Sequence, residues 1–174
     1  MSHPNCNFEG NTEGRPAELE ACSAAYVAGF MDGDGSIHFQ LVRQAGYRYG
    51  FYIRSTISFS QATTARQGLE ILQGMLGGGY VRDRGTGMSD LVITSRPLVQ
   101  DILIAVSHYV IFKEKHVKRA LELLPRIRPG LSPDEFVDLA RDADAFSTLN
   151  YSKGSRFLPW MSSDIYVARV AVPL

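Results

Sequence analysis

The stretch YVAGFMDGDGS at residues 26–36 predicts a short helix with an unusual surface. Small residues recur every four positions, at Ala25, Gly29 and Gly33, so they share one face of this helix. Ser23 is the expected N-cap. A face with almost no side chain allows another helix to approach closely. Two aspartates follow directly, so the bare face runs into an acidic end.

The acidic end allows more than one interpretation. The run from Asp32 to Ser36, DGDGS, could open an EF-hand calcium loop, but the twelfth position would be Arg43, where a bidentate glutamate is needed. We therefore exclude an EF-hand. A polar turn after a helix remains open from these residues alone. The bare helix face that leads into the acids favours a functional site.

Alternation of apolar and polar residues predicts two antiparallel hairpins downstream. The expected strands span residues 36–42 and 48–60, with a turn near Ala45, and then 79–85 and 90–94, with a turn at 85–87. Helices are expected over 64–76, 98–107, 114–124 and, from a capping box at Ser132, to about residue 149. The order α-ββ-α-ββ-α-α-α, without an internal repeat, predicts an α+β fold with one four-stranded antiparallel sheet.

The 174-residue chain is electrically neutral, with 18 basic and 18 acidic residues, which argues against a simple polycationic nucleic-acid binder. The charges are unevenly distributed, however. Residues 35–69 contain no acid but four arginines, Arg43, Arg48, Arg54 and Arg66. A neutral protein can therefore present one basic face to a polyanion, although an acid-poor stretch can also arise by chance.

A chain of this length is expected to form one compact domain. We expect a flexible N-terminal tail over 1–22, a single domain over 23–153 and a C-terminal extension of unknown role over 154–174. The N-terminal stretch has no basic start and no apolar run, so we expect neither a signal peptide nor a membrane anchor. The protein is expected to be intracellular, in the cytoplasm, the nucleoid or an organelle, and not secreted. Its two cysteines, Cys6 and Cys22, are expected to be reduced.

The string VAGFMDGDG resembles the conserved motif of the LAGLIDADG homing endonucleases. The resemblance continues through the polar-faced hairpin, GYVRDRG at 79–85, the lysines Lys113 and Lys115, the SPDEF helix start and LNYSKG at 149–154. It is nearest to the single-motif, homodimeric branch encoded in group I introns. The fold it implies has an αββαββα core, with a saddle-shaped four-stranded sheet and helices on one face.

The resemblance implies a homodimer in which Ala25, Gly29 and Gly33 pack the motif helix on its twin across a two-fold axis. The two helix ends then bring Asp34 of each subunit together, and such carboxylates repel unless a cation lies between them. The implied ligands are the Asp34 carboxylate and the Gly33 backbone carbonyl. The implied metal is Mg²⁺, and Mn²⁺ or Ca²⁺ can occupy the same site.

Further catalytic roles are implied for three residues. Gln61 matches a position that orders water near the metal, and Lys113 matches a lysine that stabilises charge around the scissile phosphate. From the residues alone, Gln61 could also be a solvent-facing cap and Lys113 a surface helix residue. The chain departs from the family pattern four positions after Gln61, where Ala65 replaces a basic residue. Either the adjacent Arg66 takes over that role or the role is absent.

The resemblance also implies that the sheet lies along the major groove of double-stranded DNA, with outward side chains reading base edges. The implied DNA-binding residues are His38, Gln40, Gln44, Tyr47, Arg54, Arg82 and Arg84, with Ser152 and Lys153 contacting the DNA backbone. Two subunits that each cover about one helical turn imply a pseudo-palindromic target of roughly 20 base pairs.

The implied activity is site-specific hydrolysis of both DNA strands across the minor groove, leaving 3′ overhangs. Two alternatives stay open: an intron-splicing maturase, whose partner is RNA, and a catalytically inactive DNA-binding protein. The presence of Asp34, Gln61 and Lys113 together favours cutting, because RNA binding alone does not require them. No membrane partner is expected.

Overall fold

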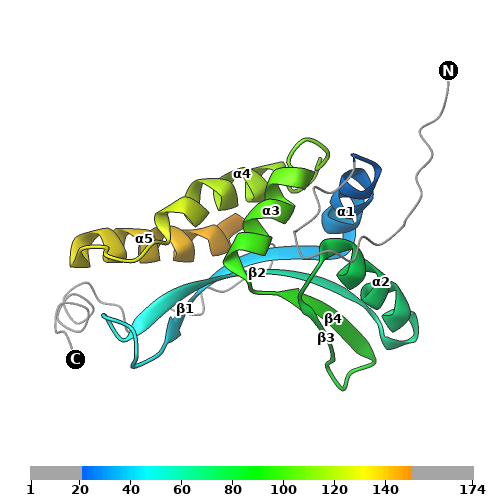
Figure 1. Cartoon of the computed structure of the whole chain (residues 1–174), viewed down its shortest axis with the longest axis horizontal. Coiled ribbons are helices and arrows are strands. Elements are labelled where there is room, and N and C mark those ends of the chain that lie inside the picture. Colours follow the sequence, from blue (N-terminus) through cyan, green and yellow to red (C-terminus); the bar gives the residue numbers. More distant parts are fainter. Residues whose placement is uncertain (1–20, 150–174) are drawn as a thin grey trace.

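The computed structural model describes residues 21–149, which form one open sheet with helices packed against it (Figure 1). In chain order, the helices and strands are α1 (Ala21–Asp34), β1 (Gly35–Arg43), β2 (Phe51–Ala62), α2 (Arg66–Leu76), β3 (Tyr80–Asp83), β4 (Met88–Ile93), α3 (Arg96–Val106), α4 (Glu114–Leu123) and α5 (Pro133–Ala145). The predicted element order and the α+β class are confirmed. No helix in the described range is long and apolar enough to cross a membrane.

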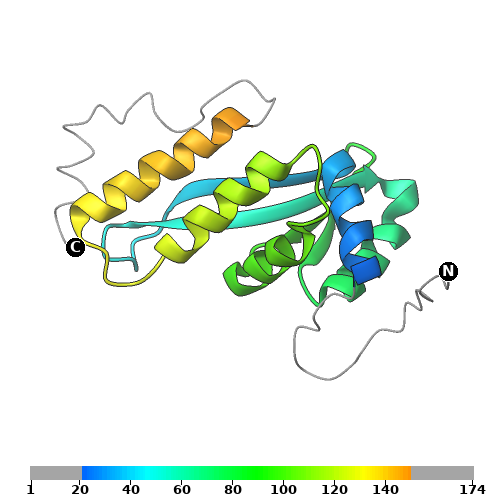
Figure 2. The same cartoon turned by 90° about the horizontal axis from the view of Figure 1, so that it is seen from above.

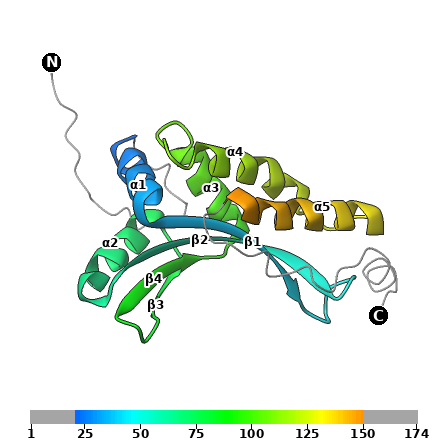
Figure 3. The ribbon, with the colours of Figure 1, turned by 180° about the vertical axis from the view of Figure 1, so that it is seen from behind.

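The sheet has the strand order β1-β2-β4-β3, and all neighbouring strands are antiparallel. It is curved like a saddle, with α1, α3, α4 and α5 above its convex side (Figure 1) and lying across the strands when seen from above (Figure 2). α2 packs beside β3 and β4 at one end of the sheet (Figure 3). The predicted saddle with helices on one face is therefore confirmed, and the described helices leave the concave face open.

The register of the strands turns one set of side chains toward the helices. Ile37 pairs with Ile57, which pairs in turn with Ile93, and all three are fully buried. Phe59 lies on the same side and stacks on Phe30 of α1, with ring centroids 5.5 Å apart. Full burial of each such side chain stabilises the fold by about 1.5–3 kcal/mol. The period-two pattern of β1 and β2 is thus the pattern that holds the helices to this face.

α1 passes into β1 without a linker, because the helix ends at Asp34 and the strand begins at Gly35. A Cβ atom at Gly35 would lie 2.6 Å from Met31 Cα and 2.7 Å from the Met31 carbonyl oxygen. Any side chain at this position would overlap the backbone of the preceding helical turn. Glycine at this junction therefore sets the angle between helix and strand, and with it the place of Asp34.

Local details differ from the sequence predictions. Ser23 lies inside α1 instead of capping it, because Ala21 and Cys22 are helical as well. Cys22 is disulfide-bonded, so the expectation of a reduced thiol is wrong there. The turn before β2 is longer than expected. Within it, the backbone N–H of Gln44 donates a 2.8 Å hydrogen bond to the backbone carbonyl of Gly50. After α5, the chain continues to residue 149 as a 3₁₀ turn.

Replacing Gly35 with alanine should lower the free energy of unfolding by about 1–3 kcal/mol, because the new methyl group overlaps the Met31 backbone. Urea unfolding followed by circular dichroism measures this change. Gly74→Ala on α2 is the matched control, since, apart from its chain neighbours and the backbone of α2 itself, no heavy atom of residues 21–149 lies within 4 Å of a Cβ there. The control should be neutral or stabilising by up to about 1 kcal/mol. Equal stabilities of the two variants would contradict the steric role of Gly35.

Candidate functional site

Asp34 and Gln61 meet at the end of α1. Asp34 is the exposed last residue of α1, and Gln61 is the second-last residue of β2. Pairing of Gly35 with Phe59 brings the two segments together. The Gln61 Nε2 donates a 2.6 Å hydrogen bond to Asp34 Oδ2, across 27 residues of sequence. The structure thus brings together two of the residues predicted to act in catalysis.

The small-residue face of α1 is open. Ala25, Gly29 and Gly33 are all exposed, and apart from chain neighbours and the backbone of α1 itself, no heavy atom of the described chain lies within 4 Å of a Cβ built at either glycine. The opposite face carries the buried residues Ala24, Val27, Ala28 and Met31. α1 therefore packs into the core through one face only. Gly33 lies where the open face meets Asp34.

Lys113 reaches the same end of α1 through Asp32. Its Nζ donates a 2.9 Å hydrogen bond to the backbone carbonyl oxygen of Asp32. The Asp32 carboxylate in turn accepts the backbone N–H of Ile111 at 2.7 Å and that of Lys113 at 2.9 Å. Sequence reasoning gave Asp32 no role once an EF-hand was excluded. No local signal could have found it, because its two backbone partners are 79 and 81 residues away.

The end of α1 offers the donors that a hard divalent cation prefers. The carboxylate of Asp34 and the carbonyl of Gly33 are oxygen ligands on exposed residues. Among residues 21–149, no three His, Cys, Asp or Glu side chains are grouped so that they could hold a metal ion. These oxygen donors are of the kind that Mg²⁺ prefers. One chain supplies a single Asp34 carboxylate, and a pair of such carboxylates would need the Asp34 of a second copy.

Arg66 is directed to carboxylates other than Asp34. It lies in the first turn of α2, with Nε 2.9 Å from Glu70 Oε1 and Nη1 2.6 Å from Asp83 Oδ1. These contacts raise the pKa of Arg66, and the hydrogen bond to Asp83 contributes most. The guanidinium is thus balanced by two acids, and its hydrogen bonds do not join it to Asp34 or Gln61.

Several of the predicted DNA-binding residues lie on the concave face of the sheet. Strand pairing places Gln40 opposite Arg54, and Arg54 Nη2 donates a 2.6 Å hydrogen bond to Gln40 Oε1. His38 is the next outward residue along β1. Burial lowers the pKa of His38, and the positive charges of Arg54 and Arg82 lower it further. Its imidazole is therefore neutral near pH 7.

Four further predicted DNA contacts fall into two groups. Gln44 and Tyr47 lie in the turn between β1 and β2, where Tyr47 stacks on Tyr52 with ring centroids 4.8 Å apart. This stacking gives the turn a defined surface at one end of the saddle. Ser152 and Lys153 lie outside the described residues.

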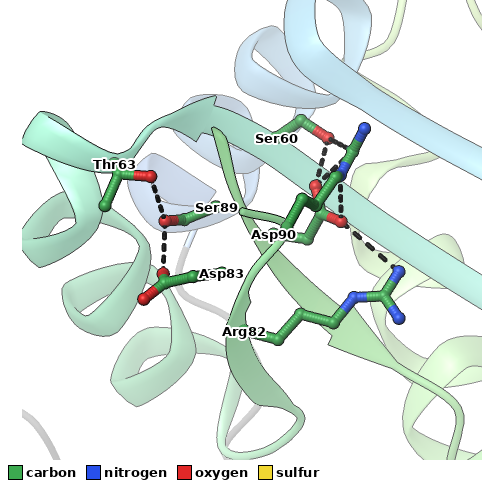
Figure 4. Close-up of polar contacts among 7 residues, drawn as sticks. Ser60, Thr63, Arg82, Asp83, Ser89 and Asp90 are labelled. Carbon is green, nitrogen blue, oxygen red and sulfur yellow. Dashed lines mark hydrogen bonds and ion pairs between the residues drawn. The ribbon is translucent and has the colours of Figure 1, made fainter. Parts of the chain in front are cut away.

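Arg82 and Arg84 converge on a buried carboxylate that the sequence did not single out (Figure 4). Asp90 of β4 is 1% exposed and accepts hydrogen bonds from Ser60 Oγ at 2.7 Å and from Arg84 Nε at 2.5 Å. Arg82 Nη2 lies 3.4 Å from the same carboxylate. The hydrogen bond from Arg84 contributes most to lowering the pKa of Asp90, with Ser60 and Arg82 acting in the same direction and burial opposing them. Asp90 therefore fixes the direction in which both arginine side chains extend from the sheet.

A second polar cluster links the same hairpin to the start of α2 (Figure 4). Ser89 Oγ lies 2.6 Å from Asp83 Oδ1 and 3.1 Å from Thr63 Oγ1. The Ser89 hydroxyl and Arg66 both lower the pKa of Asp83, with Ser89 contributing more. Because Asp83 also holds Arg66, this cluster explains why Arg66 is turned toward the β3–β4 hairpin.

Comparison with known proteins shows the family. A family model described as LAGLIDADG endonuclease matches residues 27–119. The DNA endonuclease I-CreI of Chlamydomonas reinhardtii is 32% identical over 129 residues, which cover 74% of this chain and 78% of that protein. The DNA endonuclease I-CvuI of Chlorella vulgaris is 30% identical over 129 residues, covering 74% and 80%.

A solved structure agrees with this likeness. The crystal structure of the homing endonuclease I-CvuI in complex with its target, in the presence of calcium, superposes with a TM-score of 0.71 at 28% identity and covers 76% of this chain and 85% of that one. A second I-CvuI complex, with magnesium and uncleaved DNA, matches with the same TM-score at 29% identity. The fold, the motif helix and these relatives define a class: the chain belongs to the LAGLIDADG endonuclease family.

Asp90→Asn should lower the free energy of unfolding by about 1.5–3 kcal/mol at neutral pH, because a charge-assisted hydrogen-bond network is lost. The fold lowers the pKa of Asp90. Its carboxylate therefore stabilises the native state above the unfolded pKa of about 3.9, and this contribution is lost as the pH falls through the folded value. Urea unfolding between about pH 7 and pH 3 should show the difference shrinking in acid. A pH-independent difference would contradict this assignment.

Proposed function

We propose that this chain is a site-specific endonuclease that cuts both strands of DNA as a homodimer. The observation that carries the proposal is the meeting of Asp34, Gln61 and Lys113 at the end of a helix whose outer face is bare. A carboxylate, an amide and an ammonium group there supply a metal ligand, a water-positioning group and a cation for developing charge. Phosphodiester hydrolysis uses all three.

A second copy of the chain is the proposed partner of the open face of α1. Contact through Ala25, Gly29 and Gly33 would be isologous and would bring two Asp34 carboxylates to the two-fold axis. Because close carboxylates repel, a divalent cation between them is the physical requirement. The relative I-CvuI has been crystallised with its own target in the presence of calcium, and with the I-CreI target, which was not cleaved, in the presence of magnesium. This supports Mg²⁺ as the proposed cofactor.

Four groups of the chain and a metal ion would share the chemical work. Mg²⁺, when bound, would favour ionisation of the attacking water and stabilise the charge on the leaving 3′ oxygen. Asp34 and the Gly33 carbonyl would hold it. Gln61 uses its amide nitrogen to orient Asp34, which leaves its carbonyl oxygen able to accept a hydrogen bond from a water molecule. Lys113 Nζ, held at the Asp32 carbonyl, keeps donors for a phosphate oxygen.

Arg66 takes a lesser role in this proposal. Its guanidinium is paired with two carboxylates, those of Glu70 and Asp83, so it would contact DNA only by exchanging one of them for a phosphate. In the free chain, Arg66 therefore does not supply the basic group that the family pattern has at the position of Ala65.

The concave sheet face is the proposed DNA-binding surface. Arg54, Arg82 and Arg84 supply positive charge, and Gln40 and neutral His38 supply both donors and acceptors for base edges. Gln44 and Tyr47 extend this surface into the β1–β2 turn. Because Asp90 and Gln40 already hold the arginines, less side-chain entropy is lost when DNA binds.

The cleavage test uses a plasmid library with Mg²⁺. Wild type should cut both strands of some member, and Asp34→Asn should bind that member, measured in Ca²⁺, without cutting it, because a metal ligand is lost. Asp138→Asn on α5 is the matched control: it removes the same charge from an exposed residue and should leave cutting unchanged. Failure of wild type to cut any member would favour a maturase that binds intron RNA, or an inactive DNA-binding protein.

Gly29→Leu tests the homodimer. A bulky side chain on the bare face should overpack the helix pair and raise the dimer dissociation constant by about 5- to 150-fold, since overpacking costs about 1–3 kcal/mol. Sedimentation velocity over a concentration series measures this change. Ala145→Leu, at an exposed residue of α5, is the control and should leave the dimer unchanged. A wild type that sediments as a monomer with and without DNA would contradict the proposal.

A further inference from the structure

We propose that Asp32 is a positioning residue, whose carboxylate holds the loop between α3 and α4 so that Lys113 stays at the end of α1. The inference rests on the proposed function, because it assigns Lys113 to the reaction. It adds a residue that contacts neither the metal nor the DNA in that proposal. Asp32 acts only through the backbone of Ile111 and Lys113.

The contact joins two helix ends, and each end places a charged group at the other. Asp32 lies in the last turn of α1, and Lys113 is the residue immediately before the first turn of α4. The negative carboxylate lies at the N-terminus of α4, where the helix dipole is positive, and the Lys113 ammonium lies on a carbonyl at the C-terminus of α1, where the dipole is negative. Both charges are therefore on the favourable end of the other helix, and each hydrogen bond supports the other.

The carboxylate is also the correct acceptor for two donors. Its Oδ2 accepts the N–H of Ile111 and its Oδ1 accepts the N–H of Lys113. The side chain of Lys113, the N-cap residue of α4, makes no capping hydrogen bond of its own. An asparagine at position 32 would present one oxygen and one NH₂ group, so one of the two backbone N–H groups would lose its acceptor.

Apolar packing gives this loop little support of its own. Ile111 is 76% exposed and Phe112 is 82% exposed, although Val110 before them is buried. The two residues that lead into Lys113 therefore contribute little burial to hold the loop in place. Loss of the Asp32 hydrogen bonds should free the segment that carries the lysine, because Asp32 provides the polar anchor on both sides of Phe112.

The test compares single-turnover cleavage by wild type, Asp32→Asn, Lys113→Met and the double variant, with full-length protein in Mg²⁺ and enzyme in excess. Asp32→Asn should slow cleavage of bound DNA by about 10- to 100-fold, the usual cost of a small misplacement of a catalytic group. Its DNA affinity in Ca²⁺ should match that of wild type. In the Lys113→Met background, Asp32→Asn should add less than about threefold, because the lysine it positions is gone.

Controls separate this role from general destabilisation. Asp101→Asn removes the same charge from an exposed residue of α3, and this variant should cut at the wild-type rate. Asp32→Glu keeps a carboxylate and should recover part of the rate. Hydrogen exchange should show faster exchange of the Ile111 and Lys113 amides in Asp32→Asn than in wild type, with the β2 amides unchanged. This last readout does not depend on activity, and thermal unfolding reports whether the variant folds.

Specific results would overturn the inference. A wild-type rate in Asp32→Asn, or an equal slowing in the Lys113→Met background, would show that Asp32 does not act through Lys113. Unchanged exchange at Ile111 and Lys113 would show that the carboxylate does not anchor the loop. If wild type itself cleaves no DNA, the proposed function fails before any variant is compared, so the two failures are distinguishable.

Discussion

The direct passage of α1 into β1 at Gly35 is the constraint on which the rest of the site depends. A side chain there would meet the backbone of Met31, so the helix and the strand can keep this angle only with glycine at the junction. The same geometry buries Met31 and Ile37 on either side of the turn. It leaves Asp34 exposed at the surface, within hydrogen-bond distance of Gln61 on the neighbouring strand. Core packing and the acidic end of α1 are therefore set by one backbone contact.

The site is assembled from three segments that are distant in the chain. The end of α1 contributes Asp34, the end of β2 contributes Gln61, and the loop before α4 contributes Lys113. One side-chain hydrogen bond joins α1 to β2. The loop before α4 is joined to α1 by the Lys113 ammonium on the Asp32 carbonyl and by the Asp32 carboxylate, which accepts two backbone N–H groups. Such contacts orient groups more than they stabilise the fold, because the helices and strands beneath them already supply the buried apolar surface. The remaining face of α1 stays bare and available for a second copy.

The sheet also gathers and orients arginine side chains. A neutral chain has no general attraction for a polyanion, so its positive groups have to be gathered and aimed. Pairing across strands aligns Arg54 with Gln40, and the buried Asp90 holds Arg84 and contacts Arg82. The acid is hidden beneath the basic groups that it orients, so the concave face still presents arginines to solvent. Arg66 shows the opposite outcome, because Asp83 and Glu70 keep it at the edge of α2.

Periodicity in the sequence was enough to predict the helices, the strands, their order and the inward faces, because each depends on residues two to four positions apart. The repeated small residues and the acids after them indicated the family, and the resemblance to that family implied a role for Gln61 near the metal. Local pattern could not reveal the roles of Asp32 and Asp90 or the partners of Arg66. Asp32 acts on backbone 79 and 81 residues away, and Asp90 meets Ser60 across 30 residues. These carboxylates gain their partners only when the strands pair and the loop before α4 reaches the end of α1, since a hydrogen bond depends on distance and direction in space and not on spacing along the chain.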